Sequence, residues 1–429
     1  MSIHSIMGDW SGILDIGIAQ IAIILHFTGE STGTFDYPQE NMYGHTIDQI
    51  SLDNEDLKFE CKIFSIKFEG KLIEESEIAG QWIQYGKVFP INFERGIKKV
   101  EAPKRSQEPK KPYPYIEEGV LFANLAGTLT LPSSKGPFPA VILIAGAGPS
   151  DRDATILGHK PFWILADYLT RQGIAVLRFD KRGCGKSSGN FNTATTQDFA
   201  DDVLAGIEYL KSRKEINVNQ IGLIGHSEGG VIAPAVAVMS QDVAYIVLMA
   251  AFGISGEEVL HGWDASVARS NGASQEKIDL DRQHKAECFA VLKNEANFET
   301  AAYQLRKLIK VQLDDSDAIE AEINHMNTPW FRMFLTWDPT VHLSQVRIPV
   351  LALNGELDQQ ISSKENLPVI SKALEKSGNK NFAIVELPKL NHLFQTCHNG
   401  SFSEYAKIEE TISPVVLHLI SDWIHQNKE

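Results

Sequence analysis

The chain has 429 residues, of which 43% are hydrophobic and 22% charged, proportions that exclude a disordered or membrane-embedded protein. This length predicts two or three cooperating units. The net charge of −15 and the isoelectric point near 5.4 would repel phosphate backbones and anionic membranes, and because no basic stripe offsets that charge, we expect no nucleic acid partner.

Residues 1–95 predict a small antiparallel β domain. Apolar and polar side chains alternate there with period two, as in Leu57, Phe59, Cys61 and Ile63. The apolar parity changes at Phe64, which predicts a bulge or a turn. We expect three aromatic residues of this region in its core, with a binding face as the alternative, namely Trp10, Trp82 and Tyr85.

The apolar stretch from Ile13 to Phe27 has some features of a signal peptide or a membrane span. Asp15, Gln20 and His26 interrupt it, it lacks a cationic start, and it is too short to cross a bilayer. We therefore expect no membrane span and no export signal in the chain as given. This favours the cytoplasm by default, or a mature secreted or periplasmic form if a leader has been removed.

The cysteines are far apart and form neither a CxxC pair nor a dense framework, so we expect free thiols at Cys61, Cys184, Cys288 and Cys397. A Lys- and Pro-rich linker is predicted over residues 96–115, because its composition buries little and tends to extend.

Residues 116–429 predict a mostly parallel sheet with helices on both faces, because short apolar runs alternate with helical patterns. The hairpin-like pair Gly119 to Asn124 and Leu125 to Leu131 is expected at one edge. A gap of about a hundred residues before Pro349 is too long for a structureless loop. We interpret residues of about 253–339 as a helical cap insertion that covers the site.

A GxSxG motif, Gly225-His226-Ser227-Glu228-Gly229, lies between an apolar run and a helix rich in small residues. A bare GxSxG also fits a glycine-rich turn with an exposed serine. The strand before it and the helix after it favour instead a strained turn that exposes the serine hydroxyl and aims the next N–H at a developing oxyanion. Ser227 is therefore the predicted nucleophile.

A serine nucleophile needs a base and an acid that orients the base, and with such a turn they follow the serine in the order acid, then histidine. Two loops after late apolar runs supply candidates. We favour Asp358 over Glu356 because it lies further past the strand. We favour His392 over His398 because of its position directly after the last run.

The second oxyanion donor is expected in the glycine-rich turn after residues 141–145, with the Ala147 N–H paired with the Glu228 N–H. An ordinary strand-to-helix turn is the alternative. The charged run Ser150 to Asp153 is either a solvated loop or a brace for the mouth of the site, and we favour the brace. Residues 179–187 lack the first glycine of a phosphate loop and predict a structural turn.

Together these motifs resemble the α/β-hydrolase superfamily, and more closely a bacterial group of serine esterases related to prolyl-oligopeptidase-like hydrolases. The resemblance runs from about Val120 to the C-terminus and includes Asn391-His392-Leu393-Phe394-Gln395. It implies an α/β-hydrolase fold, a triad of Ser227, Asp358 and His392, and activity on esters with short acyl chains. The first 95 residues resemble the β-rich extension of some members. Ala145 stands where lipases carry a histidine, so lipase properties are not inferred.

The predicted partner is a small-molecule ester, which the triad would cleave through an acyl-enzyme. No cofactor is expected, and no metal, because the sequence has neither HExxH nor a clustered His/Cys set. A peptidase or thioesterase using the same triad is one alternative. A catalytically inert binding protein is the alternative of another class. The sequence leaves the oligomeric state and the physiological ester open.

Overall fold

A computed structural model describes residues 3–16, 20–29, 31–38, 42–61, 66–84, 87–97, 105–313 and 316–427. The parity change predicted at Phe64, the aromatic Tyr85 and residues 98–104 of the predicted linker lie outside these ranges. The chain divides into two compact units. One comprises residues 1–104, 156–158 and 290–328, and the other comprises residues 105–155, 159–289 and 329–429.

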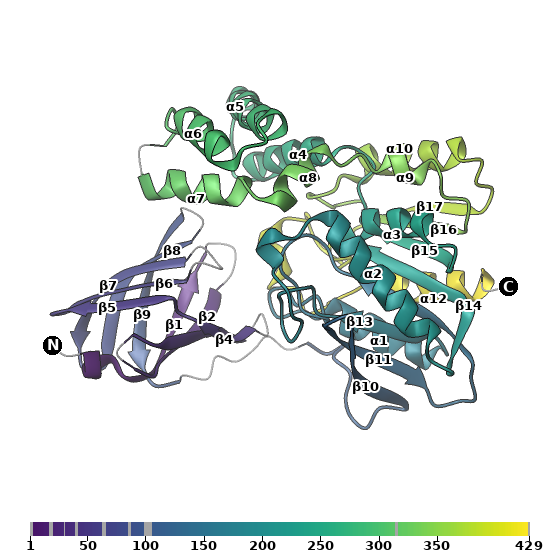
Figure 1. The fold of residues 1–429 in the computed structure, drawn as a ribbon, viewed down its shortest axis with the longest axis horizontal. Helices are drawn as coiled ribbons and strands as arrows, with labels where there is room; N and C mark the ends of the chain where they lie inside the picture. The colour runs from purple at the N-terminus through teal and green to yellow at the C-terminus, as the bar shows by residue number, and fades with distance from the viewer. Residues whose placement is uncertain are drawn as a thin grey trace. The chain divides into compact units, whose positions relative to one another are not determined.

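The N-terminal part of the first unit is a nine-stranded sheet in which every pair is antiparallel, in the order β4-β3-β2-β1-β9-β8-β7-β6-β5 (Figure 1). Its elements are the short helix η1 (Ile3–Ile6) and the strands β1 (Gly8–Asp15), β2 (Gln20–Phe27), β3 (Gly33–Tyr37), β4 (Met42–Thr46), β5 (Gln49–Asp53), β6 (Asp56–Cys61), β7 (Ile66–Glu74), β8 (Glu77–Gln84) and β9 (Lys87–Arg95). The β-rich N-terminal region is thus confirmed.

The core of this sheet is dominated by aromatic rings. Trp10 and Trp82 are fully buried, which confirms that they belong to the core. The alternation read from the sequence also holds, because Leu57, Phe59 and Cys61 all face inward on β6. Phe59 stacks on Phe68 with ring centroids 4.8 Å apart. The apolar stretch from Ile13 to Phe27 belongs to the antiparallel strands β1 and β2.

The second unit contains an eight-stranded sheet in the order β10-β11-β13-β12-β14-β15-β16-β17 (Figure 1). Its strands are β10 (Tyr115–Phe122), β11 (Leu125–Pro132), β12 (Phe138–Ile144), β13 (Ala175–Phe179), β14 (Ile216–His226), β15 (Val243–Met249), β16 (Val350–Gly355) and β17 (Phe382–Leu387). β10, β11 and β13 pair antiparallel, and the others pair parallel. The predicted edge hairpin and mostly parallel sheet are therefore confirmed.

Helices cover both faces of this sheet. Successive side chains of a strand point to opposite faces, so neighbouring residues of β12 contact different helices. Ala140 and Ile142 of β12 pack with residues of α2 (Thr196–Lys211), α3 (Glu228–Met239) and α10 (Ser363–Lys376). Val141 and Leu143 pack on the other face with residues of α1 (Pro161–Arg171) and α12 (Pro414–Gln426). This unit also contains the short segments η4 (Phe191–Thr193) and α11 (Phe402–Tyr405).

A helical insertion separates β15 from β16, as predicted. It contains α4 (Gly256–Ser270), α5 (Gln275–Asn294), α6 (Phe298–Ile309), α7 (Ser316–Met326), α8 (Pro329–Thr336) and α9 (Thr340–Leu343). α6 and α7 pack together within the first unit, whereas α4 and α8 pack together within the second.

The four cysteines all lie in the described ranges and form no disulfide bond, in agreement with the prediction. Within the described ranges, no helix combines the length and the apolar character needed to cross a membrane.

Candidate active site

Ser227 lies at a sharp turn between β14 and α3. Its backbone has φ 55° and ψ −118°, a conformation that costs energy for any residue with a side chain. The turn is held from both sides, because the Ser227 N–H donates to the Met249 carbonyl at 2.8 Å and the Gly230 N–H donates to the Ser227 carbonyl at 2.9 Å. Such strain at a half-buried serine between a strand and a helix is typical of a nucleophile elbow.

Both outer glycines of the motif are required by close backbone contacts. A Cβ on Gly225 would lie 2.0 Å from the Gly229 carbonyl oxygen, and one on Gly229 would lie 2.1 Å from the Ile144 carbonyl oxygen. Any side chain at either position would push β12, β14 and α3 apart. The GxSxG spacing is therefore a packing requirement of this turn as well as a chemical signature.

Asp358 and His392 come from the loops after β16 and β17, and the structure brings them together. His392 Nδ1 lies 2.7 Å from Asp358 Oδ2, and both side chains are almost entirely buried. The other Asp358 oxygen, Oδ1, accepts the N–H groups of Gln360 and Ile361, each at 2.8 Å. The carboxylate is thus fixed by three hydrogen bonds, which leaves His392 Nε2 as the ring nitrogen available for other chemistry.

The rival candidates lie elsewhere. Glu356 is exposed and accepts the Lys389 backbone N–H at 3.1 Å, and His398 is exposed as well. Neither residue takes part in the contact between Asp358 and His392.

The loop that carries His392 is held by buried amides. Asn391 Oδ1 accepts the N–H groups of Leu393 and Gln395, and Asn391 Nδ2 donates to Gln395 Oε1 at 2.9 Å. Gln395 Nε2 contacts Nε2 of the buried His159 at 2.9 Å. Burial lowers the pKa of His159 to about 4, so the ring is neutral at pH 7, and the same Nε2 also lies 2.8 Å from the Tyr405 carbonyl oxygen. The motif Asn391 to Gln395 therefore supports the histidine as well as supplying it.

His226 connects the serine turn to the histidine loop. Its Nε2 lies 2.9 Å from the His392 carbonyl oxygen, and the two imidazole rings are 4.7 Å apart between centroids. Burial, with the nearby His392 ring as a second cause, lowers the pKa of His226 to about 3, so the ring is neutral. In the part of the chain that the structure describes, no hydrogen bond joins Ser227 Oγ to His392. Catalytic hydrogen bonds are often long without substrate and tighten in the complex.

The turn after β12 reaches the serine. A Cβ on Gly146 would lie 3.1 Å from Ser227 Cβ, so this backbone passes directly beside the candidate nucleophile. Ala147 is exposed in this turn, and the Glu228 N–H begins α3, where the first N–H groups of a helix have no partner within the helix. The Glu228 N–H thus follows Ser227 in the chain, and the turn that carries Ala147 lies beside Ser227 in space.

A buried network around the Glu228 side chain was missed by the sequence reasoning. The carboxylate is fully buried, and its Oε1 accepts from Thr196 Oγ1 at 2.8 Å and from Trp330 Nε1 of α8 at 2.7 Å. Lys181 Nζ lies 3.4 Å from Glu228 Oε2 and donates to the Gly146 carbonyl. The sequence reasoning assigned Lys181 only to a structural turn, although a lysine two residues after a buried strand was an available signal.

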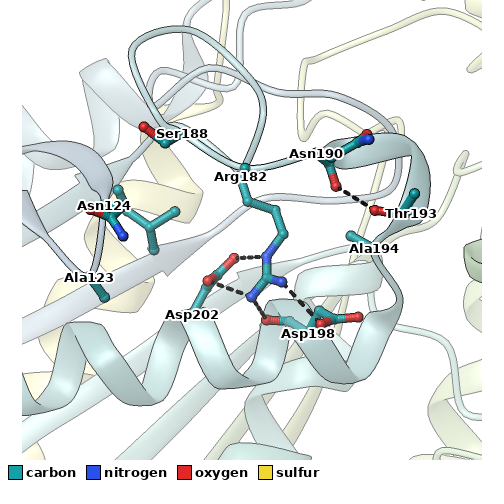
Figure 2. A pocket seen from close by; sticks show the side chains of 11 residues that line it. Ala123, Asn124, Arg182, Ser188, Asn190, Thr193, Ala194, Asp198 and Asp202 are labelled. Carbon is teal, nitrogen blue, oxygen red and sulfur yellow. Dashed lines mark hydrogen bonds and ion pairs between the residues drawn. The ribbon is translucent and has the colours of Figure 1, made fainter.

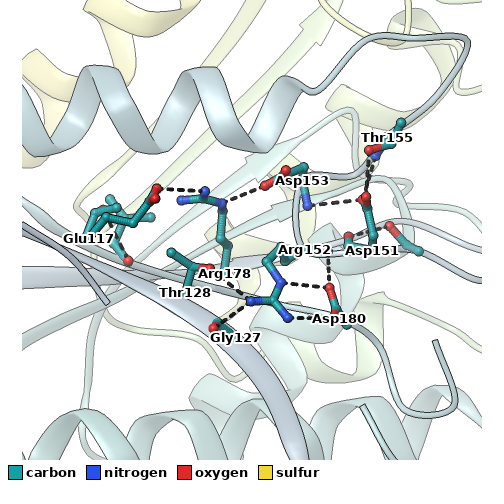
Figure 3. A network of polar contacts seen from close by, with 12 residues as sticks. Glu117, Gly127, Thr128, Asp151, Arg152, Asp153, Thr155, Arg178 and Asp180 are labelled. Carbon is teal, nitrogen blue, oxygen red and sulfur yellow. Dashed lines mark hydrogen bonds and ion pairs between the residues drawn. The ribbon is translucent and has the colours of Figure 1, made fainter. Parts of the chain in front are cut away.

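The charged run after β12 is held to the sheet by ion pairs and is not a solvated loop (Figure 3). That it braces the mouth of the site stays a prediction. The Arg152 guanidinium binds both oxygens of the Asp180 carboxylate, at 2.9 and 2.7 Å, and also donates to the Gly127 carbonyl. Arg178 pairs with Asp153 at 2.8 Å. These contacts tie the loop that carries Ala147 to the ends of β11 and β13, and residues 179–187 form the predicted structural turn.

A polar cavity of about 310 Å³ lies beside that turn (Figure 2). Its lining comes from the β10–β11 turn, from residues 182–194 and from the start of α2, and it includes none of the three candidate catalytic side chains. Arg182 is its cation, and Asp198 and Asp202 pair with it at 3.0 and 2.8 Å. Because these two carboxylates neutralise Arg182 and no candidate catalytic side chain lines the cavity, we assign the cavity no part in the reaction.

The described ranges contain no group of three or more His, Cys, Asp or Glu side chains placed to hold a metal ion.

A sequence model of the family described as "Serine aminopeptidase, S33" matches residues 162–396, more than half of the chain. The esterase EstD of Thermotoga maritima is 27% identical over 311 residues, which cover 72% of this chain and 66% of EstD. The uncharacterized protein YfhR of Escherichia coli K12 is 31% identical over 126 residues, covering 28% of this chain and 41% of YfhR. This chain therefore spans less than two thirds of either relative.

Among solved structures, the Pyrococcus furiosus esterase Pf2001 aligns with a TM-score of 0.45 and 16% identity, over 78% of this chain and 100% of that one. The family match includes the serine turn and both candidate partners, and it confirms the resemblance to α/β-hydrolases. The chain thus belongs to the serine hydrolase family described as serine aminopeptidase, S33, built on an α/β-hydrolase fold with an additional β-rich N-terminal region.

Proposed function

We propose that this protein hydrolyses carboxylic esters with short acyl chains, using Ser227 as nucleophile, His392 as general base and Asp358 as the residue that orients the base. The observation that carries the proposal is the buried 2.7 Å contact between His392 and Asp358 beside the strained serine turn. The esterase EstD among the relatives supports an ester as the substrate.

In this mechanism His392 Nε2 takes the proton of Ser227 Oγ while the oxygen attacks the ester carbonyl. Asp358 holds Nδ1–H and stabilises the imidazolium that forms. The Ala147 and Glu228 N–H groups stabilise the oxyanion of the tetrahedral intermediate. His392 then protonates the leaving alkoxide, and an acyl-enzyme remains. Water, deprotonated by His392, attacks the acyl group and releases the carboxylic acid and Ser227.

The family description favours one alternative, a peptidase that uses the same three residues. A thioesterase would need the same chemistry. Comparing kcat/KM for a p-nitrophenyl ester with that for the matched peptide p-nitroanilide and thioester separates these activities. The ester is expected to be the best of the three relative to its uncatalysed hydrolysis.

The experiment that tests the proposal is hydrolysis of p-nitrophenyl esters over a series of acyl lengths, with wild type and Ser227→Ala measured side by side. We expect the wild type to prefer short chains and the variant to lose turnover. Wild-type protein that hydrolyses none of the esters would contradict the proposal, as would a Ser227→Ala variant that retains turnover.

We further propose that the functional division follows the sequence pattern, with a β domain at 1–95, a linker at 96–115 and the hydrolase domain at 116–429. The described end of this linker supports it. Arg105 Nη2 donates to the Ala406 carbonyl at 3.1 Å, and Gln107 Nε2 donates to the Ile412 carbonyl at 2.7 Å. The linker would thus be attached to the hydrolase domain before β10 begins.

A further inference from the structure

A buried lysine contacts the backbone of the turn that carries one proposed oxyanion donor. Lys181 follows β13 by two residues, and its side chain is 5% exposed. Its Nζ lies 2.5 Å from the Gly146 carbonyl oxygen and 4.3 Å from the centroid of the Phe199 ring. An ammonium group is rarely buried unless its N–H groups have partners, and these two contacts provide partners for the Lys181 ammonium.

The Gly146 carbonyl and the Ala147 N–H belong to the same peptide unit. A cation bound to the carbonyl oxygen fixes the plane of that peptide and draws electron density toward the oxygen. The N–H at the other end then becomes a stronger donor, because hydrogen bonds in a chain polarise one another. Lys181 is thereby coupled to the Ala147 N–H without touching a substrate.

The same ammonium neutralises the residue that supplies the other proposed donor. The Glu228 carboxylate is fully buried next to Ser227, where its negative charge would oppose a developing oxyanion. Lys181 Nζ lies 3.4 Å from Glu228 Oε2, while Thr196 and Trp330 bind Oε1. Lys181 therefore contacts the residues of both proposed donors, namely the peptide unit that carries the Ala147 N–H and the side chain of Glu228.

We propose that Lys181 is a positioning residue of the oxyanion hole, which holds the peptide between Gly146 and Ala147 by its carbonyl and offsets the charge of Glu228. This inference rests on the proposed function, because it assumes an oxyanion beside Ser227. A purely structural ion pair would have needed only the contact with Glu228. The bond to the Gly146 carbonyl is the additional observation.

The test compares an oxo ester with its thionoester, whose carbonyl oxygen is replaced by sulfur. Sulfur is larger and a poorer acceptor, so a well-positioned oxyanion hole favours the oxo ester. The ratio of the two kcat/KM values does not depend on how much enzyme is folded. In Lys181→Met we expect kcat for the oxo ester to fall about 10- to 100-fold with little change in KM. The ratio of kcat/KM for the oxo ester to kcat/KM for the thionoester should fall about tenfold. This loss is smaller than the one that removal of a donor itself would cause.

Arg182→Met is the matched control, because Arg182 is the next residue and loses ion pairs of similar size without contact to Gly146 or Glu228. It should retain the wild-type ratio. Lys181→Met/Glu228→Gln removes both charges, so no unpaired carboxylate is left buried if the single variant folds poorly. It should repeat the lowered ratio.

A wild-type ratio in folded Lys181→Met would overturn the inference, and so would recovery of the ratio in the double variant, since Lys181 would then serve only to neutralise Glu228. Ester turnover by the wild type that is lost in Ser227→Ala tests the proposed function separately. A failure of the Lys181 inference therefore leaves the esterase proposal standing.

Discussion

The two sheets bury very different side chains. Among the described residues of the nine-stranded sheet, Ser11 is the only buried polar side chain, and the core is otherwise apolar and rich in aromatic rings. The second unit buries Lys181 with Glu228, Arg178 with Asp153 as its partner, and His392 with Asp358. Burying charge is costly unless each group is paired.

This difference indicates where the chemistry takes place. A fold gains more from apolar packing than from buried ion pairs, so clusters of buried charge suggest a functional role in the region that keeps them. The first sheet is built as a packing unit, whereas the second sheet carries preorganised polar groups at the carboxyl ends of β12, β13, β14, β16 and β17. Variants in the two regions should accordingly affect different measurements.

The largest expected effect is on catalysis in the second unit. Asp358→Asn should lower kcat for a short acyl ester by about 10⁴-fold, because an amide at this position favours the wrong His392 tautomer and cannot stabilise the imidazolium. The free energy of unfolding should change far less than kcat. Glu356→Gln is the control in the same loop, and equal loss of kcat in both variants would refute the assigned roles.

In the first sheet the expected effect is on stability alone. Phe59→Ala should lower the free energy of unfolding of this region by about 3–5 kcal/mol, because it removes a buried ring that stacks on Phe68. Urea titration followed by tryptophan fluorescence reports it, since Trp10 and Trp82 lie in this core. The kcat/KM of the folded variant should stay at the wild-type value, and a large loss of kcat would break the contrast between the two sheets.

An intermediate effect is expected from acid on the loop that carries His392. The pKa of His159 is lowered to about 4 in the fold, below its ordinary value of 6.5. The unfolded chain therefore binds this proton more tightly, and stability that is complete above pH 6.5 is lost as the pH falls toward 4, by up to about 3 kcal/mol.

Unfolding free energies at pH 7.5 and 4.5 test this effect. The pH-dependent difference should shrink in His159→Gln and stay unchanged in the control His398→Gln, which alters an exposed histidine. An unchanged difference in His159→Gln would show that other groups cause the loss at low pH.

The smallest effect is expected at the surface of the first sheet. Burial would lower the pKa of His26, but hydrogen bonds to Asp9 and Asp36, at 2.7 and 3.0 Å, outweigh it and raise the pKa. The stabilisation is complete below pH 6.5 and is lost as the pH rises through the higher folded value. Because solvent screens the cluster, it should amount to less than about 1 kcal/mol. His26→Gln should remove this slope between pH 5.5 and 8, and an identical slope in the variant would exclude His26 as its source.

Much of the fold could be predicted from the sequence, because the periodicities differ between the two regions. Leu57, Phe59 and Cys61 alternate as a half-buried strand does, and the apolar runs of the second unit fit strands covered on both faces. The serine turn followed from its GxSxG motif between a strand and a helix, and the two late loops followed from chain order, since their placement after strands is local.

The contacts of Lys181 could not be predicted in this way. They join residues 35 and 47 positions apart in the chain, and they depend on β12 lying between β13 and β14. Chain order does not specify which strands are neighbours, because the crossovers permute them. The support of His392 by His159, 236 positions from Gln395, was out of reach for the same reason.

The central claim is that Ser227 is an activated nucleophile, and its most direct test is covalent labelling by a serine-directed phosphonate followed by mass spectrometry of the digested protein. We expect one phosphonyl group per chain, located on the peptide that contains Ser227, and almost none on Ser227→Ala or on the wild type unfolded in urea. Absence of labelling in the folded wild type, or a label on another residue, would contradict the account.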